Sequence, residues 1–229
     1  MTRPLILLVN GNSRVELTDR MAAMARTKLS DLAEIEPMTI ATAPPYVSNR
    51  AEATEAAGEI LSAVRTRLAN TSAPRPDVVM LACFGEPGLW ALREAIPLPV
   101  TGMVEASVAA ASQLGRRIAI LTSGRDWPAQ IEDLLELYGQ SARVTRITAL
   151  PDAALSEDRN VRHPALTDAV AQDVALGRAD VLILGGGPLS GRAETLTPPS
   201  GIKMIDAFDA TLWQSLALAS LNKLPGTKP

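Results

Sequence analysis

The chain has 229 residues, a formal net charge of −3 and an isoelectric point near 5.3. No run of Lys and Arg forms a basic stripe, which excludes nucleic acid and anionic membranes as expected partners. With one cysteine and one histidine, the chain lacks the ligands for a Cys/His zinc cluster and cannot form an intramolecular disulfide.

Short apolar runs alternate along the chain with alanine-rich stretches whose apolar residues recur every three to four positions. The runs predict strands at Leu5–Val9, Val78–Ala82, Val100–Val104, Ile118–Leu121, Val181–Leu184 and Ile202–Ile205. The other stretches predict helices at Arg50–Arg67, Ser107–Leu114, Pro128–Tyr138, Pro164–Leu176 and Ala210–Leu221. Continuous apolar strands separated by helices are typical of parallel sheets covered on both faces, so we predict an α/β fold.

The first apolar run stops at Asn10-Gly11-Asn12, too early for the core of a signal peptide. No run reaches the roughly 20 apolar residues of a membrane span. We therefore expect a cytoplasmic protein with no membrane partner.

The sequence also contains an internal repeat. Leu5–Gly11 resembles Ile118–Gly124, Asp77–Cys83 resembles Asp180–Gly186, and Met103–Ala106 resembles Met204–Ala207. The offsets are 113 (124 − 11), 103 (186 − 83) and 101 (207 − 106) residues. Three matches in the same order indicate a duplication. We predict two pseudosymmetric parallel-sheet halves with the ligand cleft between them, one of residues 1–98 plus 209–229 and one of residues 99–208.

Polar and small residues follow the predicted strands, at the edge where parallel sheets bind ligands. The most reactive of them is Cys83. Because Pro87 is suited to begin a helix, we expect Cys83 to be partly accessible and more acidic than a free thiol, beside a helix N-terminus. The alternative is a buried, inert cysteine. His163, just before Pro164, is expected in an exposed loop where that helix starts.

Several segments resemble the hydantoin and allantoin racemases of the aspartate/glutamate/hydantoin racemase superfamily. The most specific is Leu-Ala-Cys-Phe-Gly-Glu-Pro-Gly-Leu around Cys83, followed by Gly102-Met-Val-Glu-Ala106. Asn10-Gly-Asn-Ser13 is similar to the family's Asn-Pro-Asn-Ser/Thr motif, and Ala43-Pro-Pro-Tyr-Val47 to its Gly-Pro loop. The resemblance covers nearly the whole chain.

The resemblance implies proton transfer without a cofactor, next to a carbonyl, between two cysteines on opposite faces of the substrate. Here Cys83 matches the first cysteine, but the second position, in the family's Leu-Gly-Cys-Ala/Gly-Gly, is Gly186. The internal repeat indicates the same position. We predict Cys83 as the catalytic residue and a substrate site of Asn10, Ser13, Phe84, Gly85, Thr122, Ser123, Gly186 and Gly187. Asp206 is expected to have a charge-paired or capping role.

The leading functional prediction is a metal-free, cofactor-independent enzyme. It would act through a stabilised carbanion on a small carboxylate, amino acid or hydantoin-like substrate. One alternative is a racemase in which Ser190 or a water replaces the second cysteine. Others are a one-cysteine decarboxylase resembling arylmalonate decarboxylase and a non-catalytic ligand-binding protein. The expected partner is a small molecule; the sequence leaves open whether the chain forms homo-oligomers.

Overall fold

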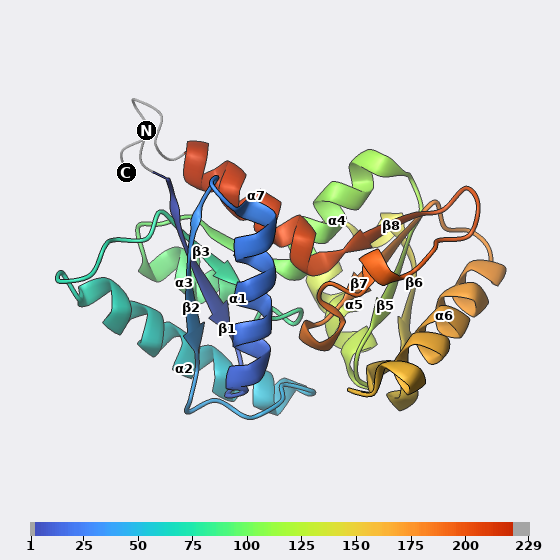
Figure 1. Ribbon diagram of the computed structural model, residues 1–229, viewed down its shortest axis with the longest axis horizontal. Coiled ribbons are helices and arrows are strands. Elements are labelled where there is room, and N and C mark those ends of the chain that lie inside the picture. The colour runs from blue at the N-terminus through green and yellow to red at the C-terminus, as the bar shows by residue number, and fades with distance from the viewer. Residues whose placement is uncertain (1–2, 222–229) are drawn as a thin grey trace. The chain divides into compact units, whose positions relative to one another are not determined.

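The computed structural model describes residues 3–221, which form two compact units (Figure 1). The first contains residues 3–103 and 211–221, and the second residues 104–210. Each unit has its own four-stranded parallel sheet with flanking helices, so the predicted α/β fold is confirmed. That the ligand cleft lies between the halves stays a prediction.

The first unit has the strand order β2-β1-β3-β4. Its strands are β1 (Leu5–Asn10), β2 (Glu34–Thr39), β3 (Val78–Leu81) and β4 (Val100–Gly102). Its helices are α1 (Val15–Leu29), α2 (Arg50–Ala69) and α3 (Leu89–Ala95). Parallel pairing places the carboxyl ends of β1 and β3 side by side, with Val9 opposite Leu81.

The second unit has the corresponding order β6-β5-β7-β8. Its strands are β5 (Ile118–Thr122), β6 (Val144–Ala149), β7 (Val181–Gly185) and β8 (Lys203–Asp206). Its helices are α5 (Trp127–Leu137) and α6 (Arg159–Ala175), with short 3₁₀ turns η1 (Ser141–Arg143), η2 (Asp152–Leu155), η3 (Gly187–Leu189) and η4 (Ala193–Thr195). In both units the first strand pairs with the second and third, and the third with the fourth, which agrees with a duplication.

Two helices carry the chain from one unit to the other: α4 (Met103–Leu114) and α7 (Ala207–Leu221). The sequence prediction began the second lobe at residue 99, and the second compact unit of the structure begins at residue 104. β4 belongs to the first sheet because Val100 pairs with Val79 of β3. The predicted strand Val100–Val104 also ends early, since α4 begins at Met103.

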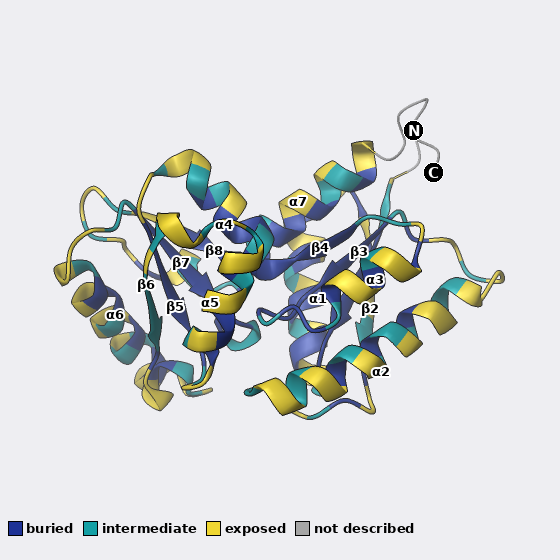
Figure 2. Cartoon of the chain, turned by 180° about the vertical axis from the view of Figure 1, so that it is seen from behind, coloured by how far each residue is buried: buried dark blue, intermediate teal, exposed yellow. Residues whose placement is uncertain are grey.

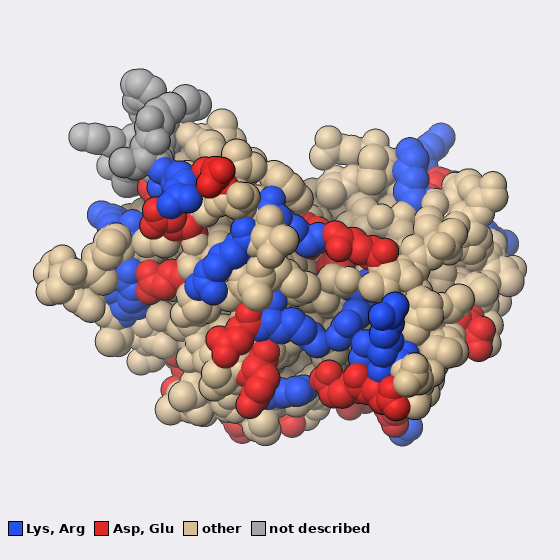
Figure 3. Space-filling view, in the orientation of Figure 1, with Lys and Arg blue, Asp and Glu red and all other residues tan. Residues whose placement is uncertain are grey.

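The inner strands form the core of each unit. Every residue of β3, β5 and β7 is buried, whereas the edge strands β2 and β6 are mostly half-exposed (Figure 2). Burial on both faces explains why the inner strands are continuous apolar runs. On the face shown in Figure 3, Lys and Arg side chains are interspersed with Asp and Glu. Within residues 3–221, no helix combines the length and the apolar character of a membrane span.

Helix α6 begins earlier than the sequence suggested. Asp158 caps it, because its carboxylate accepts a hydrogen bond from the Asn160 N–H (2.9 Å). His163 and Pro164 therefore lie inside the helix, and His163 is half-buried rather than an exposed loop residue. Pro164 lies beyond the first turn, so the helix lacks the hydrogen bond that an N–H at residue 164 would donate to Asn160 O.

Candidate active site

Cys83 lies two residues beyond Leu81, at the carboxyl end of β3. Gly11 lies two residues beyond Val9, at the end of the neighbouring strand β1. A Cβ atom added to Gly11 would lie 3.1 Å from Cβ and 3.4 Å from Sγ of Cys83. The thiol side chain therefore packs directly against the Gly11 backbone, which only a residue without a side chain leaves open.

The thiol is buried, with 8% of the residue exposed. Burial raises the pKa of Cys83 to about 11; a backbone hydrogen bond from Gly85 lowers it and the charge of Glu86 raises it further. The prediction of an accessible, acidic thiol is therefore wrong. Its physical premise also fails, because α3 begins only at Leu89 and a turn separates it from Cys83.

The first predicted substrate group, Asn10, ends β1 and is almost fully buried. Its Nδ2 donates to Asn12 Oδ1 (2.9 Å) and Thr18 Oγ1 (3.0 Å), which fixes the orientation of the amide. Its Oδ1 is buried without a hydrogen-bond partner among the described residues. A buried acceptor left unpaired costs about 1–3 kcal/mol, which a donor from a ligand or a water would offset. Ser13 follows this turn, and its N–H donates to Pro44 O (3.2 Å).

Phe84 and Gly85 continue the turn after Cys83. The Phe84 side chain is buried, and Gly85 contributes the backbone hydrogen bond to the thiol. Glu86 was not among the site residues predicted from the sequence. Glu86 is buried in the turn with a positive φ of 50°, and its carboxylate occupies the space where a Gly102 side chain would project. In the sequence, the only sign of this packing is Gly102 at the end of β4, which leaves space for a side chain from the turn after Cys83.

The second unit has a corresponding group of residues at the ends of β5 and β7. Thr122 is fully buried, and its Oγ1 has no hydrogen-bond partner within residues 3–221. Ser123 follows it and is also buried. Gly186 follows β7 with φ +133°, and a Cβ atom there would lie 2.6 Å from Ser123 Oγ. Both the backbone conformation and the neighbouring hydroxyl thus require glycine at position 186.

The turn after Gly186 is held by a buried carboxylate. Asp206, at the end of β8, accepts hydrogen bonds from the N–H groups of Gly191 (2.7 Å) and Phe208 (3.0 Å). Its pKa is raised to about 7 because it is buried and faces Asp209. Asp206 therefore has a capping role, as the sequence indicated. Gly187 begins the 3₁₀ turn η3, and Ser190 Oγ donates to Gly186 O (3.5 Å).

The structure thus brings the predicted residues together in two groups. Asn10, Ser13, Cys83, Phe84 and Gly85 belong to the strand ends of the first unit, and Thr122, Ser123, Gly186 and Gly187 to those of the second. That the two groups act on one substrate stays a prediction.

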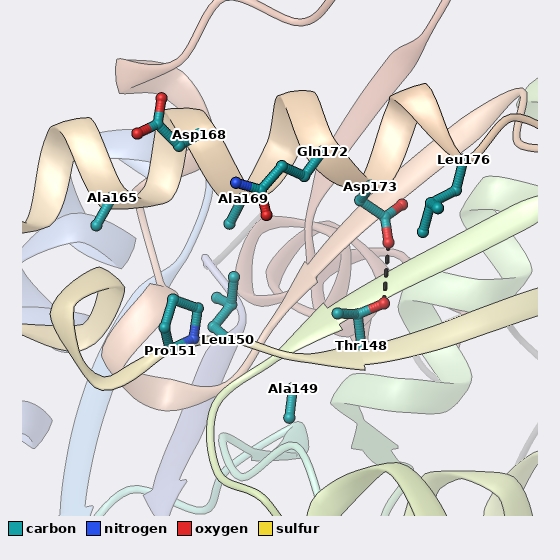
Figure 4. A pocket seen from close by; sticks show the side chains of 10 residues that line it. All are labelled: Thr148, Ala149, Leu150, Pro151, Ala165, Asp168, Ala169, Gln172, Asp173 and Leu176. Atoms are coloured by element: carbon teal, nitrogen blue, oxygen red, sulfur yellow. Dashed lines mark hydrogen bonds between the residues drawn. The ribbon is translucent and has the colours of Figure 1, made fainter.

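A cavity of about 480 Å³ lies elsewhere in the second unit, between β6 and α6. Its walls contain none of the predicted site residues (Figure 4). At one end, Asp173 accepts a hydrogen bond from Thr148 (2.9 Å) and forms an ion pair with Arg146. These bonds fix α6 on the edge strand, which gives the polar end of the cavity a structural role.

Comparison with known proteins places these observations in a family. The model of the Asp/Glu/Hydantoin racemase family matches residues 6–215. The hydantoin racemase of Rhizobium meliloti is 26% identical over 215 residues, covering 93% of this chain and 88% of that protein. The hydantoin racemase of Paenarthrobacter aurescens is 27% identical over 221 residues, covering 94% and 91%.

Solved structures agree. An allantoin racemase from Pseudomonas fluorescens superposes with a TM-score of 0.84 at 27% identity, covering 95% of this chain and 92% of its own. Arylmalonate decarboxylase superposes with a TM-score of 0.62 at 17% identity, covering 99% and 98%, which is a likeness of fold.

Proposed function

Because the chain belongs to the Asp/Glu/Hydantoin racemase family, we propose that it catalyses proton transfer at a carbon next to a carbonyl, with Cys83 as its single thiol acid/base. The substrate is a small carboxylate, amino acid or hydantoin-like molecule. A hydantoin-like ring is the first choice, because relatives across most of the chain are named hydantoin and allantoin racemases.

The observation that carries the proposal is the packing of Cys83 at the paired ends of β1 and β3. The thiol lies against the Gly11 backbone, and the preceding residue, Asn10, has a buried Oδ1 without a partner among the residues described. An unpaired polar oxygen one residue before the glycine that contacts the only thiol of the chain supports a ligand site rather than an ordinary core position. The amide acceptor would bind an N–H of the substrate.

The reaction needs Cys83 in both protonation states. As a base, the thiolate takes the proton from carbon and becomes a thiol, and the carbon keeps the electron pair as an enolate. As an acid, the thiol returns the proton to carbon and becomes a thiolate, and the substrate regains its starting charge. With a pKa near 11, Cys83 is a thiol at neutral pH and is ready to act as the acid. Backbone N–H groups of the glycine-containing turns would stabilise the enolate oxygen.

A second candidate function is decarboxylation, and Gly186 is the observation that favours it. Glycine has no ionisable group, so the second unit offers no thiol as a second acid/base group. Loss of carbon dioxide leaves the same kind of carbanion, which needs only one acid to protonate it. One thiol is therefore sufficient for decarboxylation but not for two-base racemisation.

Deuterium incorporation distinguishes these functions. The protein is incubated in D2O with amino acids, 5-substituted hydantoins and substituted malonates, and products are analysed by mass and chiral chromatography. Exchange with retention indicates one-base chemistry, inversion indicates racemisation, and carbon dioxide release indicates decarboxylation. Cys83→Ser should abolish whichever reaction is found. Turnover that survives this substitution would contradict the proposal.

A further inference from the structure

We propose that Ser123 occupies, in the second unit, the place that the Cys83 thiol occupies in the first, and that its hydroxyl contacts the substrate there. The inference rests on the proposed function for its substrate, but its geometry is independent of that function. Gly186 corresponds to Cys83, as the sequence repeat predicted, but the space that a side chain at residue 186 would enter holds the Ser123 hydroxyl.

The strand pairing defines which positions correspond. In the first unit, Val9 of β1 lies opposite Leu81 of β3, and in the second, Leu121 of β5 lies opposite Leu184 of β7. Two residues beyond the first pair lie Gly11 and Cys83. Two residues beyond the second pair lie Ser123 and Gly186. Ser123 therefore corresponds to Gly11, and Gly186 corresponds to Cys83.

In each unit, one member of the pair is glycine and the other fills the space beside it. A side chain at Gly11 would lie 3.4 Å from Cys83 Sγ, and one at Gly186 would lie 2.6 Å from Ser123 Oγ. The two units have exchanged the roles of their strands: the filling side chain comes from the end of β3 in the first unit and from the end of β5 in the second. The space next to Gly186 is thus already occupied by a hydroxyl.

The exchange has a chemical consequence. A serine hydroxyl without a neighbouring base does not remove a carbon-bound proton, but it donates a hydrogen bond to a carboxylate or an enolate oxygen. Ser123 thereby replaces an acid/base group with a hydrogen-bond donor. A thiol at residue 123 would restore an acid/base group to this place.

If Ser123 occupies this place, a thiol introduced at residue 123 should act as a second acid/base group. Ser123→Cys places a thiol where the hydroxyl is and leaves Gly186 in its glycine conformation. It should raise the rate of inversion of 5-methylhydantoin at least about tenfold over wild type, since one positioned acid/base group is typically worth ~10²–10⁴-fold. Gly186→Cys should not, because φ +133° and the contact with Ser123 oppose any side chain. Ser141→Cys, which adds a thiol at an exposed serine of η1, is the matched control and should leave inversion at the wild-type rate.

Two further measurements separate this inference from the proposed function. In Cys83→Ser/Ser123→Cys, the introduced thiol should be alkylated by iodoacetamide only slowly in the folded protein, because residue 123 is as buried as Cys83. 5-Methylhydantoin should lower this slow rate at least several-fold further. In addition, the loss of melting temperature caused by Gly186→Ala should be partly restored by adding Ser123→Gly, because the two side chains compete for one space.

The outcomes are distinct. The role of Ser123 would be overturned if wild type shows Cys83-dependent exchange but Ser123→Cys shows neither inversion nor protection of its thiol. The proposed function would then remain intact. No exchange with any substrate would overturn the proposed function, and protection of the introduced thiol would still support a ligand contact. If Ser123→Gly restores nothing to Gly186→Ala, the shared space is refuted whatever the activity.

Discussion

The thiol of Cys83 should be slow to react in the folded protein. Burial raises its pKa from 9.0 to about 11, so at pH 8 the thiolate fraction is about 100-fold smaller than that of an unshifted thiol. Because only the thiolate is alkylated, the reaction with iodoacetamide should slow by about the same factor. The difference corresponds to about 2.7 kcal/mol between the two protonation states. This reverses the sequence-based expectation of an acidic cysteine.

The assay is the rate of alkylation from pH 7 to 11, in the native protein and in urea, followed by mass spectrometry. Wild type has one cysteine, so every adduct reports on Cys83, and Cys83→Ser is the blank. In urea the rate should level off near pH 9, whereas in the native protein it should still rise tenfold per pH unit up to about 11. Alkylation of the native protein that is half-maximal at or below pH 8.5 would refute the argument from burial.

The same titration predicts the pH dependence of the reaction. Proton removal needs the thiolate, so deuterium exchange should accelerate as pH rises toward 11. Protonation after decarboxylation needs the thiol, so that reaction should be independent of pH until it declines near 11. The pKa of Cys83 is higher in the folded protein than in the unfolded chain. The contribution of Cys83 to the free energy of unfolding is therefore lost as pH rises from 9 through 11.

Three other predictions concern the surroundings of the site. Gly11→Ala should displace the Cys83 side chain and lower activity at least about tenfold, which kinetics would measure. Gly58→Ala, on the open surface of α2, should instead stabilise the folded protein by about 0.5–1 kcal/mol, which melting curves would measure. The pKa of Asp206 is raised from 3.8 to about 7, so the free energy of unfolding should fall by up to about 4 kcal/mol as pH rises from 4 to 7. Urea unfolding at several pH values should show this fall in wild type and a flatter dependence in Asp206→Asn. Asp173→Ala should lower the free energy of unfolding by about 3 kcal/mol and the melting temperature by about 6–12 °C, because it removes the ion-pair partner of Arg146. The exposed control Asp168→Ala should change stability little, and equal losses in the two variants would argue against the ion pair.

The sequence predicted the inner strands and the edge strands β4 and β8, but it missed the edge strands β2 and β6. β3, β5 and β7 are buried on both faces, so each is an unbroken apolar run. β2 reads Glu-Ile-Glu-Pro-Met-Thr and β6 reads Val-Thr-Arg-Ile-Thr-Ala, and both are half-exposed at the edge of their sheets. Charged residues and proline are compatible with an edge strand, but they hide it from a search for continuous apolar segments.

The positions of the site residues were predictable, whereas the chemical state of the thiol was not. Strand ends and family motifs placed Cys83, Asn10 and Thr122 beside the correct strands. The pKa of Cys83 depends on burial and on the carboxylate of Glu86, and both follow from the tertiary packing of the turn. A local pattern such as Pro87 predicted a helix start, but the helix begins two residues later, beyond Gly88 in a left-handed conformation.

The exchange between Cys83 and Ser123 is not isolated, because the carboxylates of the two units follow the same principle. Leu81 lies opposite Gly102, and Leu184 lies opposite Asp206, so strand pairing matches Asp206 with Gly102 and not with Glu105, as the sequence repeat had it. The space of the missing Gly102 side chain is filled by the Glu86 carboxylate. Each unit therefore has a buried carboxylate at the same place, supplied by the end of β8 in one and by the turn after β3 in the other. After duplication, close packing requires that each space be filled, but it does not require the same element to fill it. For this reason the sequence repeat matched Gly186 with Cys83 correctly, as the strand pairing does, but it could not reveal that Ser123 of the neighbouring strand fills the space beside Gly186.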